Sequence, residues 1–256
     1  MAGGTSLLLF GAGACAGVMN AVAGGGSFLT LPALVFAGLP SVTANASSTV
    51  ALAPATLASV WAYMSGPRRT GLVDVGGVPI IRLIAMSAAG GLTGAVLLLS
   101  TPVRLFDGIL PWLLLLATCA FLFGGRVSAY LRERAHGGPA AVLPLQFLVG
   151  IYGGYFGGAV GIMALAAWSL VDRHDLKALH PTRMLTVAAM NVIAVAYFVA
   201  RGEVRWPETL AMLVGAVAGG FLGGRLGQRL PPTVTRYIIL GVTIGTTLVF
   251  FRRAYF

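Results

Sequence analysis

The sequence predicts an all-α integral membrane protein made of about eight hydrophobic segments in two homologous four-segment repeats. First, 57% of its 256 residues are hydrophobic and only 9% are charged, so the chain has too few polar groups to cover a water-soluble globule. Second, apolar segments long enough to cross about 30 Å of hydrocarbon account for nearly all of the chain. Third, the same glycine landmarks recur in the same order in both halves.

The apolar segments are read directly from the sequence. They cover residues 6–38, 42–64, 78–99, 105–123, 142–170, 184–200, 207–223 and 234–251. Strands of a membrane β-barrel would alternate apolar and polar residues, and runs such as Leu113–Leu116 do not alternate. The chain is therefore predicted to cross the bilayer as helices.

The two repeats are separated by one hydrophilic stretch. We assign residues 1–125 to the first membrane repeat, 126–141 to a loop linker and 142–256 to the second membrane repeat. Landmarks that match between the halves include Gly13 with Gly150, Gly17 with Gly154, and Gly90-Gly91 with Gly219-Gly220. Their common order favours duplication, the usual construction of a secondary transporter.

Each repeat opens with a segment that glycine interrupts. Gly24, Gly25 and Gly26 each cost a helix about 1 kcal/mol relative to alanine, which predicts a broken helix. Gly157, Gly158 and Gly161 form the weaker copy. If both segments are re-entrant, the second repeat is inverted and the 17 basic residues divide twelve against five; if both cross once, they divide ten against seven. The positive-inside rule favours the inverted arrangement, with both termini outside the cytoplasm.

The interrupted segments are the first candidate site. Amide groups at the ends of broken helices suit an anion, so Gly24, Gly25, Gly26 and Ser27 are predicted to bind one while Asn20 orients it. The second-half glycines, at 157, 158 and 161, are predicted to form the other half of the site. The alternative is that these glycines only permit close helix packing.

A set of polar residues lies at the start of each segment that follows an interruption. Asn45, Ser47, Ser48 and Thr49 could line an anion path with neutral hydrogen-bonding groups, or could only cap the helix. In the second half, Thr182, Arg183 and Asn191 are the matching candidates. Arg183 is either a direct anion contact or a marker of the cytoplasmic side.

Other functional classes are weakly supported. The seven acidic residues all lie at segment edges or in loops, which disfavours antiport coupled to a buried carboxylate. The net charge of +10 lies in short loops, where we interpret it as a signal of topology and headgroup contact rather than of nucleic-acid binding. Cys15 and Cys119 are interpreted as packing residues, and we expect neither a metal site nor a cofactor.

The order of these landmarks resembles the TauE/SafE family of sulfite and sulfonate exporters. The carrying motifs are Gly13–Gly17 with Asn20, Gly24–Gly26 and Pro32, then Ala44–Thr49, Gly71–Asp74, Gly150–Gly161, Asn191 and Gly202–Trp206. The resemblance implies a multi-pass bacterial inner-membrane transporter that exports a small sulfur-containing or organic anion by alternating access. The chain departs from the usual family pattern at Asn45–Ser48 and at Pro181–Arg183, which leaves the substrate open.

Three alternatives remain beside an anion carrier. A passive anion channel differs in showing no counterflow, and a non-transporting membrane subunit or scaffold differs in binding a partner stably. An intramembrane hydrolase using Ser27 or Ser48 lacks a histidine within any apolar segment. We therefore predict no enzymatic activity, a lipid bilayer and a small anion as partners, and an oligomeric state that is open, a homodimer included.

Overall fold

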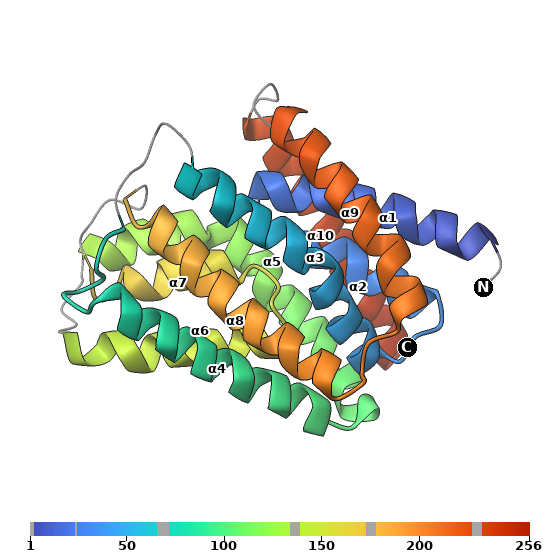
Figure 1. Cartoon of the computed structure of the whole chain (residues 1–256), viewed down its shortest axis with the longest axis horizontal. Helices are drawn as coiled ribbons and strands as arrows, with labels where there is room; N and C mark the ends of the chain where they lie inside the picture. Colours follow the sequence, from blue (N-terminus) through green and yellow to red (C-terminus); the bar gives the residue numbers. More distant parts are fainter. Residues whose placement is uncertain (1–2, 24, 66–71, 134–138, 173–177, 227–231) are drawn as a thin grey trace. The chain divides into compact units, whose positions relative to one another are not determined.

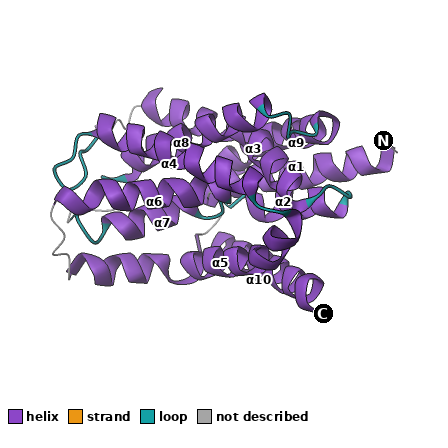
Figure 2. Cartoon of the chain, turned by 90° about the horizontal axis from the view of Figure 1, so that it is seen from below, coloured by secondary structure: helices purple, strands orange, loops and turns teal. Residues whose placement is uncertain are grey.

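The computed structural model describes residues 3–23, 25–65, 72–133, 139–172, 178–226 and 232–256. These residues form ten α-helices and one short 3-10 helix, and their only strand-like feature is an isolated bridge between Val75 and Val78 (Figures 1 and 2). The prediction of an all-α protein is therefore confirmed.

The helices follow the predicted apolar segments closely. They are α1 (Gly3–Ala23), α2 (Ser27–Phe36), α3 (Ser41–Ser65), α4 (Ile80–Ser100), α5 (Val103–Glu133), η1 (Pro139–Ala141), α6 (Val142–Tyr155), α7 (Val160–Trp168), α8 (His180–Ala200), α9 (Trp206–Leu226) and α10 (Pro232–Tyr255). Each of the two longest apolar segments is divided into two helices, α1 and α2 in the first and α6 and α7 in the second. Both divisions fall at the glycine-rich stretches where the sequence predicts a break.

Helix α5 is longer than the sequence predicts. It continues through residues 126–133, which the sequence analysis assigns to the loop linker. Charge and polarity mark where a chain leaves hydrocarbon, but arginine, leucine, alanine and glutamate remain good helix formers in water. The helix therefore extends past the end of its apolar segment.

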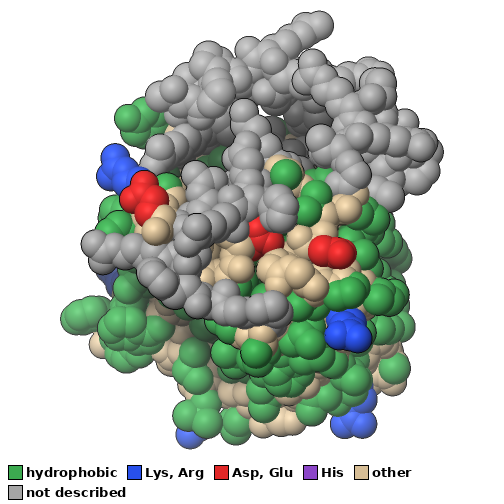
Figure 3. Space-filling view, turned by 90° about the vertical axis from the view of Figure 1, so that its left-hand side faces the viewer, with side chains coloured by type: hydrophobic (Ala, Val, Ile, Leu, Met, Phe, Trp, Pro, Cys, Tyr) green, Lys and Arg blue, Asp and Glu red, His purple; other side chains and the backbone are tan. Residues whose placement is uncertain are grey.

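Among the described residues, four helices have the length and apolar composition to cross a membrane. They are Ile80–Ser100, Val103–Leu131, Pro181–Ala200 and Tyr237–Tyr255, and shorter apolar helices accompany them. Leu210, Val214, Val217 and Phe221 form an exposed apolar stripe along α9, as expected of a helix in contact with lipid. In the face shown in Figure 3, apolar side chains cover much of the described surface and charged side chains are few. The chain is a multi-pass membrane protein.

One compact unit contains residues 1–56, 99–118 and 198–256. Within it α1 packs along α9 (Figure 1). A β-carbon on Gly17 would overlap the carbonyl oxygen of Ala216, and one on Gly219 would overlap that of Ala14. The two helices thus touch backbone to backbone, a contact that only glycine permits at these positions.

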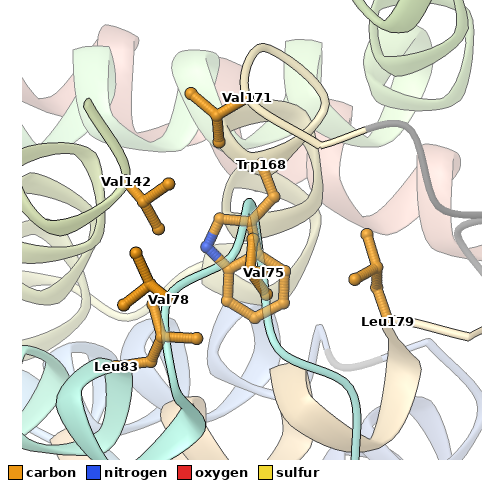
Figure 4. Close-up of a cluster of buried hydrophobic side chains, with 7 residues drawn as sticks. All are labelled: Val75, Val78, Leu83, Val142, Trp168, Val171 and Leu179. Atoms are coloured by element: carbon orange, nitrogen blue, oxygen red, sulfur yellow. The ribbon is translucent and has the colours of Figure 1, made fainter. Parts of the chain in front are cut away.

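The other compact unit contains residues 57–98 and 119–197. Here α4 packs against α6, and β-carbons on Gly94 and Gly154 would overlap the carbonyl oxygens of Ile151 and Gly91. A cluster of seven buried side chains packs around Trp168 (Figure 4). Its members come from the segment before α4, from α4, α6 and α7, and from the residues that follow α7: Val75, Val78, Leu83, Val142, Trp168, Val171 and Leu179.

The compact units differ from the predicted repeats. The first helix of each predicted repeat packs against the third apolar segment of the other one, α1 against α9 and α6 against α4. Each unit thus draws its helices from both halves of the chain. The repeats at residues 1–125 and 142–256 remain a prediction about sequence ancestry, whereas the units describe packing.

The α1–α9 contact generates a stability prediction. Gly17→Ala places a methyl group on the Ala216 carbonyl, so we expect the free energy of unfolding to fall by about 1–3 kcal/mol. Gly11→Ala in the same helix is the matched control, because a β-carbon there has no described atom within 4 Å. Thermal unfolding of the purified protein in detergent measures both, and equal midpoints for the two variants would contradict the packing described here.

Candidate functional site

The interruption between α1 and α2 is a tight, buried turn. Gly25 and Gly26 are buried, and Gly26 keeps helical angles, with φ −56° and ψ −32°. The amides of Phe28 and Leu29 donate to the carbonyls of Gly25 and Gly26, at 3.2 and 3.0 Å. A β-carbon on Gly26 would lie 2.9 Å from the Ala16 carbonyl oxygen and 3.1 Å from Asn20 Cβ. Asn20 therefore lies beside the turn, and Gly24 lies outside the described residues.

Helix α2 is attached to its neighbours by hydroxyl groups. Thr30 Oγ1 donates to the Gly26 carbonyl at 3.3 Å and lies 2.5 Å from Ser48 Oγ on α3. Pro32 has no N–H for the carbonyl of Phe28, four residues earlier, and Thr246 on α10 donates to that carbonyl instead at 3.2 Å. The broken segment is thus held by α3 on one side and by α10 on another.

The polar run of α3, which consists of Asn45, Ser47, Ser48 and Thr49, contacts different parts of the structure. Asn45, Ser47 and Ser48 are buried, whereas Thr49 is half-buried and donates to the Asn45 carbonyl at 3.0 Å. Ser47 Oγ accepts from the backbone N–H of Arg205, immediately before α9, at 3.2 Å. Ser48 faces the interruption through Thr30, while Ser47 positions the start of α9. Ser27, the first residue of α2, is half-buried.

The interruption between α6 and α7 has a different geometry. Gly157 has φ +76° and Ala159 has φ +56°, both in the left-handed region. A non-glycine residue in that region costs about 1–2 kcal/mol. The Tyr152 hydroxyl donates to the carbonyl of buried Gly158 at 2.7 Å, and its ring packs on Phe156 with centroids 6.0 Å apart. The hydrogen bond and ring contact of Tyr152 thus stabilise the strained turn.

Arg183 lies over the first turn of α7. A β-carbon on Gly161 would lie 3.5 Å from Arg183 Nη1 and 3.6 Å from its Cζ, so the absence of a side chain at Gly161 leaves room for the guanidinium. Arg183 is half-buried on α8, as is Asn191 two turns further along that helix. The structure therefore brings two predicted site residues together, a cation and the beginning of a broken helix.

Thr182 is fully engaged by the backbone. Its hydroxyl donates to the Val73 carbonyl at 2.8 Å and accepts from the Val73 amide at 3.1 Å. It thereby attaches the start of α8 to the segment that enters α4. Ser47 likewise attaches α3 to the segment that enters α9. In each unit, a hydroxyl near the start of one long helix therefore holds the backbone that leads into another helix.

Several residues of these sites were absent from the sequence prediction. Thr30 had a signal, since it lies four residues after Gly26 and thus on the same helix face. Tyr152 had none, because its role depends on the geometry of the turn. The buried network in which Trp168 Nε1 donates to Gln146 Oε1 and Gln146 Nε2 donates to Ser87 Oγ, at 2.8 and 2.6 Å, joins α7, α6 and α4. Within the described ranges, no three His, Cys, Asp or Glu side chains cluster as metal ligands.

Comparison with known proteins places the chain among membrane transporters. Residues 9–250 match the family model described as sulfite exporter TauE/SafE. A probable membrane transporter protein of Haemophilus influenzae is 28% identical over 214 residues, covering 83% of this chain and 81% of the relative. The probable membrane transporter protein YfcA of Escherichia coli K12 is 30% identical over 213 residues, covering 83% and 77%.

A third relative, from Sinorhizobium, is also named a probable membrane transporter protein and is 31% identical over 217 residues, covering 82% of this chain and 78% of the relative. No solved structure gives a significant match. The family model spans nearly the whole chain, and the relatives are transporters rather than enzymes. The chain therefore belongs to the TauE/SafE sulfite exporter family of membrane transporters.

Proposed function

We propose that this transporter exports a small sulfur-containing or organic anion, such as sulfite, sulfoacetate or a related sulfonate, across the bacterial inner membrane by alternating access. Membership of the family supports the class of cargo. The observation that carries the proposal is the guanidinium of Arg183 above Gly161 at the start of α7. The charged donors of the guanidinium and the positive end of the helix dipole both favour binding of an oxyanion.

In this proposal Arg183 is the principal anion contact in its unit. Gly157, Gly158 and Gly161 set the path of the backbone beneath it, Thr182 fixes the start of α8, and Asn191 adds an amide two turns along the helix. Arginine presents several N–H donors in a plane, which fits the three oxygens of a sulfite or sulfonate group. An arginine within a membrane helix is costly, and a protein-lined anion site is a reason to retain one.

Neutral hydrogen-bonding groups within the other unit form a second proposed anion-binding group. Its members are Asn20, Gly24, Gly25, Gly26 and Ser27 at the interruption, with Asn45, Ser47, Ser48 and Thr49 on α3. Neutral donors bind an anion less strongly than a second arginine, which suits a carrier that must also release its cargo. Ser47 and Thr49 act through the backbone groups that they hold, and Ser48 acts through Thr30.

The arrangement of the chain in the membrane is part of the proposal. We propose two repeats of opposite orientation, at residues 1–125 and 142–256, with the interrupted segments as their equivalent openings. The similar backbone contacts of α1 with α9 and of α6 with α4 support the equivalence. A homodimer is compatible with this arrangement, and light scattering in detergent measures the oligomeric state.

Flux measurements test the proposed cargo. The purified protein is reconstituted in liposomes and exposed to sulfite, sulfoacetate, taurine or chloride, with currents on a solid-supported membrane and tracer flux as readouts. We expect a saturable signal with sulfite or sulfoacetate and counterflow that identifies a carrier. Saturable flux without counterflow would favour the passive channel, and no signal with any anion from folded protein would overturn anion transport.

Removing the charge of Arg183 should weaken anion binding. A charge-assisted hydrogen bond contributes about 1.5–3 kcal/mol, so we expect Arg183→Gln to raise the apparent KM of anion flux roughly tenfold to a hundredfold. Arg183→Lys keeps the charge without the planar donors, so its apparent KM should lie between those of the wild type and Arg183→Gln. Arg201→Gln, at an exposed position just after α8, is the control. An unchanged KM in Arg183→Gln would exclude the direct contact.

Filling the space at Gly161 should have a size-dependent effect. An alanine β-carbon would meet Arg183 at ordinary contact distance, 3.5 Å, so Gly161→Ala should transport nearly as the wild type does. Gly161→Leu should displace the guanidinium and raise the apparent KM toward that of Arg183→Gln. Tracer flux at graded anion concentrations measures the series, and a leucine variant with wild-type KM would show that the anion does not bind there.

A further inference from the structure

Glu208 is a buried carboxyl group in the first turn of α9. Its side chain is 9% exposed, and its Oε2 atom is buried without a hydrogen-bond partner among the described residues. Buried polar atoms are nearly always paired, and an exception marks a catalytic group or a place for water or an ion. A buried carboxylate is costly unless it pairs with a cation or is neutralised by a proton. The lack of a partner therefore calls for a functional explanation.

The position of Glu208 connects it to the polar run of α3. Arg205, three residues earlier and so about 4.5 Å away along the helix axis, donates its backbone N–H to Ser47 Oγ at 3.2 Å. Thr43 donates to Oε2 of Glu203 in the same turn, at 3.4 Å. Ser41 Oγ, at the first residue of α3, is also buried without a described partner. Two unpaired polar groups thus lie on the two segments that these hydrogen bonds join.

A proton fits Glu208 better than a metal ion does. A calcium ion requires about six to eight oxygen ligands, whereas a proton requires one carboxylate oxygen. The described chain offers no group of three acidic, histidine or cysteine side chains. Helices α1 and α3 contain no charged residue, and Cys15 on α1 is exposed. The charged groups between α8 and α9 are Glu203, engaged by Thr43, and Arg201 and Arg205, whose side chains are exposed.

We propose that Glu208 is the proton-binding group of this transporter and that one proton moves with each anion. The inference rests on the proposed anion transport. An ionised carboxylate on the segment that Ser47 holds through Arg205 repels an anion at the polar run, whereas the protonated group does not. Because coupling between two ligands is reciprocal, the anion must favour protonation as much as the proton favours anion binding. This mutual preference predicts symport rather than exchange.

Proteoliposomes containing the full-length protein test the coupling. Sulfoacetate is the probe, since both of its acid groups stay ionised between about pH 6 and about pH 8 and it carries no proton of its own. We expect sulfoacetate entry to acidify the lumen, as reported by a trapped pH-sensitive dye.

Glu208→Gln imitates the protonated group permanently. This variant should transport sulfoacetate without lumen acidification. Glu203→Gln, which removes the acid five residues earlier in the loop before α9, is the matched control and should keep the proton movement. Proton movement that persists in Glu208→Gln would overturn the assignment, as would wild-type flux that depends on sodium.

A labelling experiment on the wild type serves in case Glu208→Gln does not fold. Dicyclohexylcarbodiimide reacts with protonated carboxyl groups in apolar surroundings, and peptide mass spectrometry locates the adduct. We expect an adduct on Glu208 that increases as sulfoacetate is added. No adduct on Glu208 would overturn the proposal. Anion flux without proton movement would overturn the coupling alone, whereas no flux with any of the four anions would overturn the proposed function and the coupling with it.

Discussion

Backbone contact between helices, made possible by glycine, is the interaction on which both compact units depend. Lipid is as apolar as leucine, so burying apolar side chains gives little driving force for helix association within a bilayer. Close van der Waals packing must supply it, and α1 with α9 and α4 with α6 achieve this where glycine meets a facing carbonyl. These contacts also fix the partners, because a β-carbon at Gly17 or Gly94 would separate the helices. The high glycine content therefore has a structural cause apart from any role in the interruptions.

The interruptions illustrate how costly a broken helix is in a membrane. Each freed carbonyl needs a donor from the protein, since hydrocarbon offers none. Thr246 supplies one where Pro32 cannot, and Tyr152 supplies one at Gly158, whereas the Gly26 carbonyl already accepts the backbone amides of Leu29 and Thr30. The two turns nevertheless differ, helical at Gly26 and left-handed at Gly157 and Ala159. The proposed anion site lies at the second interruption, where Arg183 is next to Gly161.

Much of the architecture could be predicted because composition and periodicity are local properties. The helix boundaries, the two interruptions and the family follow from apolar length, glycine placement and landmark order. The end of α5 could not be predicted from the drop in hydropathy, since residues 126–133 are polar and helical at once. Of the candidate site, the pairing of Gly161 with Arg183 and the place of Asn20 beside Gly26 agree with the predicted groups. The hydrogen-bond donors Thr30 and Tyr152 were not among the predicted site residues.

The sequence by itself determined that the chain is helical, crosses a membrane, breaks at two places and belongs among the TauE/SafE transporters. Only the tertiary structure decided which helices pair, which hydroxyls hold backbone groups and which charged side chains are buried. Glu208 shows the limit most clearly, since its position near a segment end suggests exposure and its environment is buried. The physical reason is that a membrane helix is apolar on the face toward lipid and on the face toward protein alike. Hydrophobic periodicity therefore cannot distinguish them, and long-range contacts must.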